Sequence, residues 1–222
     1  MSELNLIQQI CIWVIPVVFA ITVHEVAHGY VARMFGDSTA YMLGRLTLNP
    51  VKHVDPVGTL LVPGLLLMMK SGFLFGWAKP VPVSTRYFKH PRRDMAIVAL
   101  AGPVANLAMA LFWGLLLKLG LALGGQGLAQ GLIYMGAAGI AINLVLMVLN
   151  LLPLPPLDGS RVLNGFLPES AARTVDRFEQ YGLFLVVILL ATGMLSRIMN
   201  PMLQAAQTGL MTILGLPSIR IF

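Results

Sequence analysis

Long apolar runs separated by short polar stretches are the dominant pattern along this chain of 222 residues. A transmembrane α-helix needs about 20 predominantly apolar residues, because the hydrocarbon core of a bilayer is about 30 Å thick. Three runs reach this length, at about residues 4–32, 95–117 and 132–152. A fourth, at about residues 181–196, is shorter. Lipid offers no partners to backbone polar groups, so we expect each run to be helical. The pattern predicts an all-α polytopic membrane protein with a single integral-membrane domain over residues 1–222.

Two further apolar segments have an ambiguous relation to the membrane. Residues 57–69 form a short run that Pro63 and Gly64 interrupt, with basic residues on both sides, which favours a re-entrant or membrane-edge element over a tilted span. Residues 198–219 carry no charge but contain prolines and glycines, and form either an interfacial segment or a last span. Between the spans, residues 73–88 are rich in aromatic residues, proline and valine and predict a small extended or hairpin element at the membrane edge.

The composition agrees with a membrane protein and indicates its orientation. Charged residues make up 11% of the chain, against about 25% in soluble domains. The net charge is +6, but most basic residues lie between residues 33 and 93, in the connection between two predicted spans. This is the positive-inside pattern of a cytoplasmic loop, so we expect an inner-membrane protein with an external N-terminus and no nucleic-acid partner. The first run lacks the basic start of a signal peptide, and we expect it to remain as the first span.

A cluster of ionisable residues, reading HEVAH at residues 24–28, lies near the C-terminal end of the first predicted span. Residues four positions apart lie on one helix face, so His24 and His28 can bind the same zinc ion. Glu25 lies beside the first of them, where it can act as general base toward the water of a hydrolytic reaction. Chance packing is the alternative, but ionisable groups are costly in a membrane and so favour a function. We predict one Zn²⁺ per chain.

A catalytic zinc ion typically has three protein ligands, so another segment has to supply the third. Asp158 is the best candidate, because the predicted 132–152 span ends on the same side of the membrane as HEVAH and three prolines then stop the helix. The alternative is that Asp158 caps a helix. His53 and Asp55, on the connection after the first span, are rival ligands or line the entrance to the site.

Asn106 and Asn150 lie in otherwise apolar spans, where a side-chain amide needs hydrogen-bond partners. One interpretation is hydrogen bonding between helices. The other is that the two amides hold the substrate backbone or stabilise the developing oxyanion. The residues alone leave both interpretations open.

Three motifs together, HEVAH at 24–28, AGPVAN at 101–106 and NLLPLPPLDG at 150–159, resemble those of the site-2 protease family of intramembrane zinc metalloproteases. The segments NPVKHVDPVGTLLVP and FGWAKPVPV are similar to those of short bacterial members that consist of little more than the catalytic core. The resemblance implies a catalytic core of three helices plus additional helices, with zinc inside the membrane near the cytoplasmic face. It also implies an extended element at the membrane edge that pairs with the unwound substrate.

The resemblance further implies a role for each residue of the motifs. The zinc ligands would be His24, His28 and Asp158, and Glu25 would be the general base. Asn106 and Asn150 would be assisting residues near the substrate.

These expectations combine into one function, an intramembrane zinc endopeptidase that cleaves transmembrane segments of membrane-protein substrates within the lipid bilayer. A helical substrate shields its own peptide bonds, so we expect it to unwind and to pair with the FGWAKPVPV segment by strand addition. The alternative is a non-hydrolytic zinc-binding or zinc-transporting membrane protein. A transporter should carry polar groups through the full depth of the membrane, whereas the external half of these spans offers almost none.

Overall fold

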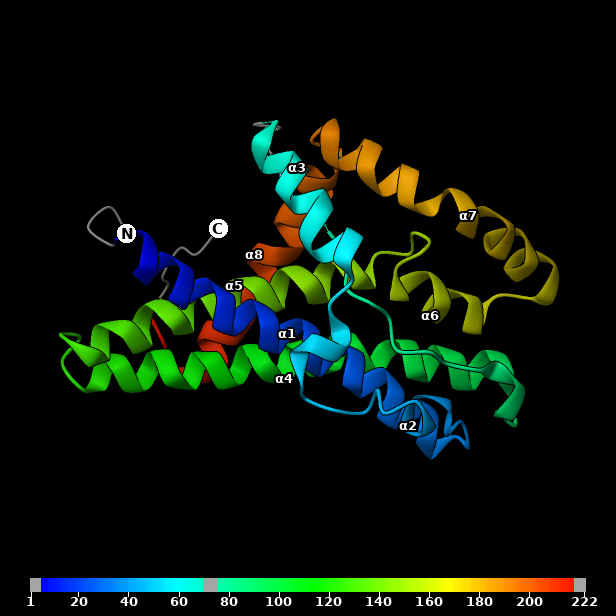
Figure 1. The fold of residues 1–222 in the computed structure, drawn as a ribbon, viewed down its shortest axis with the longest axis horizontal. Helices are drawn as coiled ribbons and strands as arrows, with labels where there is room; N and C mark the ends of the chain where they lie inside the picture. Colours follow the sequence, from blue (N-terminus) through cyan, green and yellow to red (C-terminus); the bar gives the residue numbers. More distant parts are fainter. Residues whose placement is uncertain (1–4, 70–75, 218–222) are drawn as a thin grey trace.

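The structure is a computed structural model that describes residues 5–69 and 76–217. Within these ranges the regular secondary structure is helical, which confirms the all-α fold class (Figure 1). In the described part of the chain, three helices are long and apolar enough to cross a membrane, over Ile7–Met34, Pro91–Ala122 and Leu128–Leu151. The α-helices are α1 Leu6–Met34, α2 Thr39–Met42, α3 Val62–Met68, α4 Pro91–Ala122, α5 Leu128–Leu151, α6 Asp158–Phe166, α7 Glu169–Ala191 and α8 Met194–Leu214. The shorter helical elements are η1 Pro50–His53, η2 Pro56–Leu61 and η3 Thr85–Tyr87.

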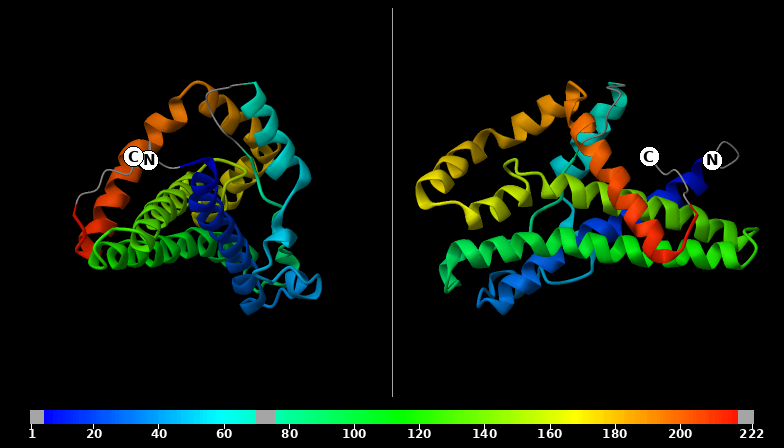
Figure 2. Two further views of the ribbon diagram at one scale, coloured as in Figure 1. Left: turned by 60° about the vertical axis from the view of Figure 1, so that its left-hand side comes forward. Right: turned by 180° about the vertical axis from the view of Figure 1, so that it is seen from behind.

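Helices α4 and α5 form the centre of the bundle. They lie side by side, joined by a short turn, and α1 packs across both of them (Figures 1 and 2). Glycines permit the close approach, because a Cβ at Gly139 of α5 would collide with the ring of Trp113 and a Cβ at Gly136 would collide with Leu117. Small residues are the usual means by which membrane helices approach each other. Helices α1, α4 and α5 therefore form a tight three-helix core.

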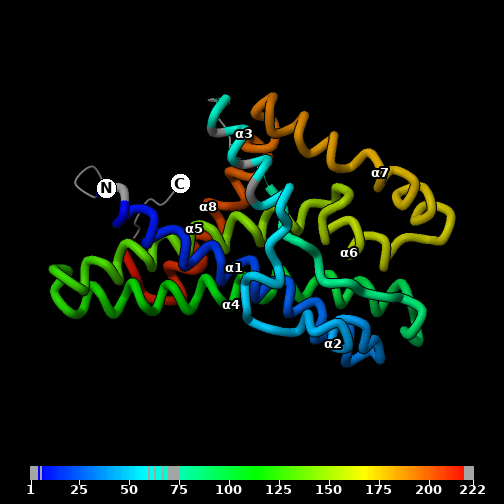
Figure 3. The backbone as a smooth tube through the Cα atoms, viewed as in Figure 1, coloured from blue at the N-terminus to red at the C-terminus, as the bar shows by residue number. Residues whose placement is uncertain are grey.

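The connection from α1 to α4 contains the predicted membrane-edge element. Residues Pro56–Leu61 form a π-helical turn that continues into α3, and among the described elements α3 packs only against this turn and projects from the bundle (Figures 1 and 3). We call residues 76–84 the strap; they are extended chain that forms neither strand nor hairpin among the described residues. The first part of the predicted extended element, up to residue 75, lies outside the described residues.

Helices α7 and α8 form a pair bent by 82°. The break lies at Thr192 and Gly193, and Gly193 has a φ of 72°, in the left-handed region that favours glycine. The pair is long and apolar enough for a membrane span only when both helices are taken together, as a broken span or a re-entrant element. The apolar run expected at about 181–196 therefore contains the break. Helix α8 packs against α4 and α5 and includes most of the segment 198–219.

Candidate metal centre

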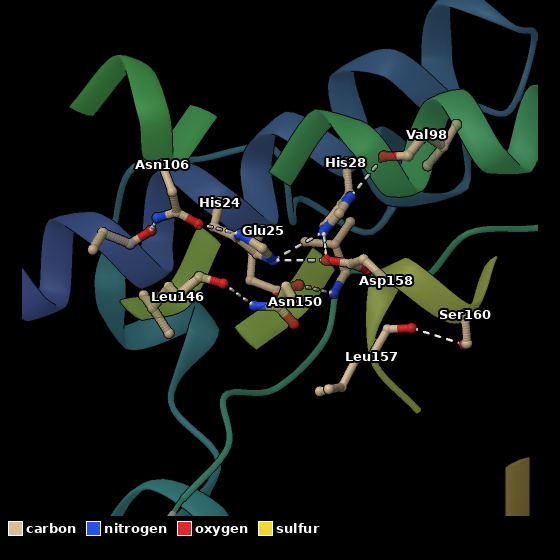
Figure 4. A network of polar contacts seen from close by, with 12 residues as sticks. His24, Glu25, His28, Val98, Asn106, Leu146, Asn150, Leu157, Asp158 and Ser160 are labelled. Carbon is tan, nitrogen blue, oxygen red and sulfur yellow. Dashed lines mark hydrogen bonds and ion pairs between the residues drawn. The ribbon is translucent and has the colours of Figure 1, made fainter. Parts of the chain in front are cut away.

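Two elements distant in the sequence bring His24, His28 and Asp158 together. The histidines lie one turn apart on α1, and Asp158 is the first residue of α6 (Figure 4). Asp158 Oδ2 lies 3.2 Å from His24 Nε2 and 3.3 Å from His28 Nε2. The three side chains are buried, and their nearest ligand atoms all lie within 4.8 Å of one another, as suits a metal ion. Among the described residues, these three form the one group of histidine, cysteine and carboxylate side chains with such geometry.

Asp158 reaches this position because the chain turns sharply after α5. The proline-rich residues that follow Leu151 end that helix, and α6 begins at Asp158. Gly159 lets the first turn of α6 approach the end of α5, since a Cβ there would collide with the carbonyl oxygens of Leu151 and Leu152. The side chain of Asp158 is buried at the start of α6, and its Oδ2 faces both imidazoles.

Gly102 of α4 provides the space for both imidazole rings. A Cβ at this position would collide with His24 and with His28. The glycine of the AGPVAN segment thus allows α4 to pack directly against the face of α1 that carries His24 and His28.

A chain of side-chain amides determines the tautomer of His24. Asn143 Nδ2 donates to the backbone oxygen of Gly139 at 2.9 Å, so Asn143 presents its oxygen to Asn106 Nδ2, also at 2.9 Å. Asn106 therefore turns Oδ1 toward His24, whose Nδ1 lies 2.6 Å away (Figure 4). Because Oδ1 can only accept, His24 Nδ1 carries the proton and Nε2 is left with a bare lone pair.

The same reasoning applies to His28. Its Nδ1 lies 2.8 Å from the backbone oxygen of Val98, which can only accept, so His28 Nε2 also has a bare lone pair. The two Nε2 atoms face each other at 3.1 Å, and Asp158 Oδ2 faces both. In the neutral imidazoles no proton is available between these atoms, so three electron-pair donors converge. Such a set repels itself unless a cation lies among its members, and a histidine held through its other nitrogen is the usual arrangement at metal sites.

Glu25 lies next to this group without being part of it. Its Oε2 accepts a hydrogen bond of 2.8 Å from the backbone N–H of Val81 in the strap. A carboxylate that lies beside two imidazoles and is held by a separate donor can accept or deliver a proton there.

A cavity of about 560 Å³ opens beside His24 and Glu25. Its walls come from α1, α5, α7, the chain around η1 and η2, the strap and the loop before α6. Most of the lining is apolar, with Val17, Val18, Ile21, Val54, Trp77, Ala78, Ile142, Leu146, Leu149, Pro156, Leu157, Leu183 and Val186. The size and the apolar lining are typical of a cavity that binds a ligand.

Three further residues were predicted from the sequence, and two of them, His53 and Asn150, line the cavity. His53 is buried and lines the cavity, and its Nε2 lies 2.9 Å from the backbone oxygen of Thr47. Asn150 also lines the cavity, and its Nδ2 donates to the backbone oxygen of Leu146 at 3.0 Å. Asp55 caps η2 by accepting the N–H groups of the following turn. Neither His53 nor Asp55 belongs to the three-residue group among the described residues.

Two contributions to the site were not found from the sequence. Asn143 is completely buried and orients Asn106, and its signal was present as a third amide in an apolar span. The N–H of Val81 gave no signal, because a backbone donor becomes functional only through tertiary contacts.

The family described as Peptidase family M50 matches residues 116–194, which include Asp158 but not HEVAH. YwhC of Bacillus subtilis, provisionally named a zinc metalloprotease, is 42% identical over 203 residues, covering 90% of this chain and 89% of that protein. Rip2 of Mycolicibacterium smegmatis, with the same kind of name, is 35% identical over 180 residues, covering 80% of this chain and 66% of that protein. No solved structure matches the chain.

Apolar helices of membrane-spanning length surround a buried group of two histidines and a carboxylate, and the relatives are named as zinc metalloproteases, so the class is a multi-pass membrane metalloprotease. The similarity to YwhC spans nearly the full length of both proteins. The chain belongs to peptidase family M50, the family of the site-2 proteases.

Proposed function

We propose that this protein cleaves transmembrane segments of other membrane proteins, with one Zn²⁺ held by His24, His28 and Asp158. The observation that carries the proposal is the convergence of three lone pairs inside the helix bundle, next to the carboxylate of Glu25. Two imidazoles and one carboxylate are a common ligand set of catalytic zinc, which keeps a further position open for water or substrate. When bound, zinc acidifies a water molecule and polarises the scissile carbonyl group.

In the proposed reaction, proton transfer uses a side chain of the protein itself. Glu25 takes the proton of the attacking water and delivers it to the nitrogen of the leaving amine. Asn106 orients His24 rather than contacting the substrate, because its side chain is fully buried and its amide is already bonded to His24, Asn143 and Ala20. Asn150 lines the cavity and is the amide that can reach a substrate backbone; His53 lines the same cavity.

The strap offers one edge to an unwound substrate. The N–H groups of alternate strap residues, Trp77, Lys79 and Val81, donate into the protein, to Gly58 O at 3.1 Å, His53 O at 2.9 Å and Glu25 Oε2 at 2.8 Å. In extended chain the intervening residues face the opposite edge. There Ala78 can pair with a substrate strand, while Pro80 and Pro82 have no N–H and end the pairing.

The charge pattern supports an orientation for this active site. HEVAH lies toward the C-terminal end of α1 and Asp158 follows the C-terminal end of α5, on the side of the bundle that carries the basic connection before α4. By the positive-inside rule this side is cytoplasmic. The proposal therefore places the site near the cytoplasmic face of the inner membrane, with the N-terminus outside.

The test is cleavage of a purified single-span substrate in proteoliposomes by the wild type and by Glu25→Gln. We expect Glu25→Gln to keep bound zinc and lose cleavage, and Asp158→Ala to lose zinc as well. Zinc flux into the same vesicles is measured in parallel. Proteolysis by Glu25→Gln at the wild-type rate, or zinc flux without proteolysis, would reject the proposal.

A further inference from the structure

We infer that the backbone N–H of Val81 is a positioning group that keeps Glu25 a base and prevents it from becoming a metal ligand. The inference rests on the proposed function for the role of Glu25. Its starting observation is the hydrogen bond of 2.8 Å from Val81 N to Glu25 Oε2, made by a residue 56 positions away. The bond occupies one carboxylate oxygen and leaves Oε1 for the attacking water.

The sequence around Val81 makes this N–H unusual. The strap reads KPVPV over residues 79–83, and its two prolines have no N–H. Val81 therefore carries the one backbone donor between Lys79 and Val83, and the residue is buried, with 7% of its surface exposed. A water molecule has little access to compete for this donor.

Contacts on both sides of Val81 hold the strap in place. Arg45 Nη2 donates to the backbone oxygens of Lys79 at 2.9 Å and of Pro80 at 3.3 Å. Farther along, the N–H of Ser84 donates to Asp37 Oδ2 at 2.6 Å. The donor is thus fixed from both directions and does not depend on the Val81 side chain alone.

A glycine in α1 provides the space for this contact. Gly29 lies one turn after Glu25 on the same face of the helix, and a Cβ there would meet the side chains of Val81 and Leu46. The glycine that directly follows HEVAH therefore lets the strap approach α1 at the level of the carboxylate.

The need for a holding group follows from the chemistry of the site. Glu25 is adjacent to His24, and a carboxylate is itself a good zinc ligand. An unrestrained glutamate next to the metal can rotate and occupy the position that water requires. A hydrogen bond to an ionised acceptor is stronger than one between neutral groups, so the Val81 N–H opposes that rotation.

The test compares Val81→Pro, which removes the N–H, with Val83→Pro, which adds a proline to the same strap and keeps the Val81 donor. Each variant is prepared with zinc for kinetics and with cobalt(II) for visible absorption, which reports on the coordination of the metal. We expect Val81→Pro to bind one metal ion, to lose kcat by about tenfold or more relative to Val83→Pro, and to change the cobalt spectrum. In the Glu25→Gln background the same proline should leave the cobalt spectrum unchanged, because a neutral amide is a poor ligand.

The inference is overturned if Val81→Pro and Val83→Pro have equal kcat and equal spectra, or if the spectral change persists in the Glu25→Gln background. If Val81→Pro does not fold or bind metal, Arg45→Ala takes its place, since it loosens the strap without touching its backbone. That variant should then show the same Glu25-dependent spectral change, and its absence counts against the inference. Because the cobalt spectra need no substrate, a failure of the proposed proteolysis remains distinguishable from a failure of this inference.

Discussion

The imidazole of His24 and the amide of Asn106 are in contact at 2.6 Å across 82 positions of sequence. This contact turns His24 so that Nε2 faces His28 and Asp158, and it decides which nitrogen carries the proton. It also connects α4 to the candidate metal site, because Asn106 of α4 is itself oriented by Asn143 of α5. The three helices of the core therefore all contribute to the ligand geometry.

Replacing Asn106 should weaken metal binding without removing a ligand. Asn106→Ala leaves His24 Nδ1 without its acceptor, so the ring can rotate or change tautomer. Loss of such a partner typically lowers metal affinity roughly 10–100-fold. Competition with a zinc chelator measures the affinity, and Asn150→Ala is the matched control because its amide bonds only to Leu146 O among the contacts of the described residues. Equal zinc affinities of the two variants would contradict the orienting role of Asn106.

Gly102 should tolerate no side chain. A methyl group at this position collides with both histidine rings, and overpacking of this kind costs about 1–3 kcal/mol. We expect Gly102→Ala to lower the thermal midpoint in detergent and to reduce zinc content. Gly209→Ala in α8 is the control, since a Cβ there meets nothing within 4 Å, and it should be as stable as the wild type or slightly more stable. Normal zinc content in Gly102→Ala would show that the rings can move away.

The geometry of HEVAH was predictable because it is local. The spacing of His24 and His28 sets their common face on any helix, and the direction of the spans places Asp158 at the same membrane edge. The amide network and the Val81 donor were not predictable, because they depend on how α4, α5 and the strap pack together. Asn106 and Asn150 looked alike in the sequence. Only the packing of the helices shows that Asn106 contacts His24 and that Asn150 lines the cavity.

The end of the chain shows a different limit of sequence reasoning. Hydropathy located an apolar run at about 181–196, but helix α7 begins at Glu169, in a charged region that carries no hydropathy signal. The break at Gly193 depends on its left-handed φ, which one glycine within an apolar stretch does not reveal.

Gly193 should be required for the bend between α7 and α8. A residue with a Cβ in the left-handed conformation costs roughly 1–2 kcal/mol, so Gly193→Ala should lower the thermal midpoint. Helix α7 contributes Leu183 and Val186 to the cavity, so the substrate KM should rise as well. Gly131→Ala in α5, where a Cβ has open space, controls for the substitution itself. An unchanged midpoint for Gly193→Ala would mean that the bend does not need glycine at this position.

Trp77 should influence which substrates are cleaved. Its indole lies against Gly58, where a Cβ would collide with the ring, and it forms one wall of the cavity next to Glu25. We expect Trp77→Ala to widen the cavity, so that substrates with larger apolar side chains beside the scissile bond gain in kcat/KM relative to those with small ones. Zinc content should not change, because the three proposed ligands are positioned by Asn106, by the backbone oxygen of Val98 and by one another. Trp13→Ala is the matched control, since Trp13 is 38% exposed and Trp77 is 37% exposed, but Trp13 does not line the cavity. The measurement is cleavage of a substrate series that differs only at that side chain, and an identical size preference in both variants would exclude Trp77 from substrate selection.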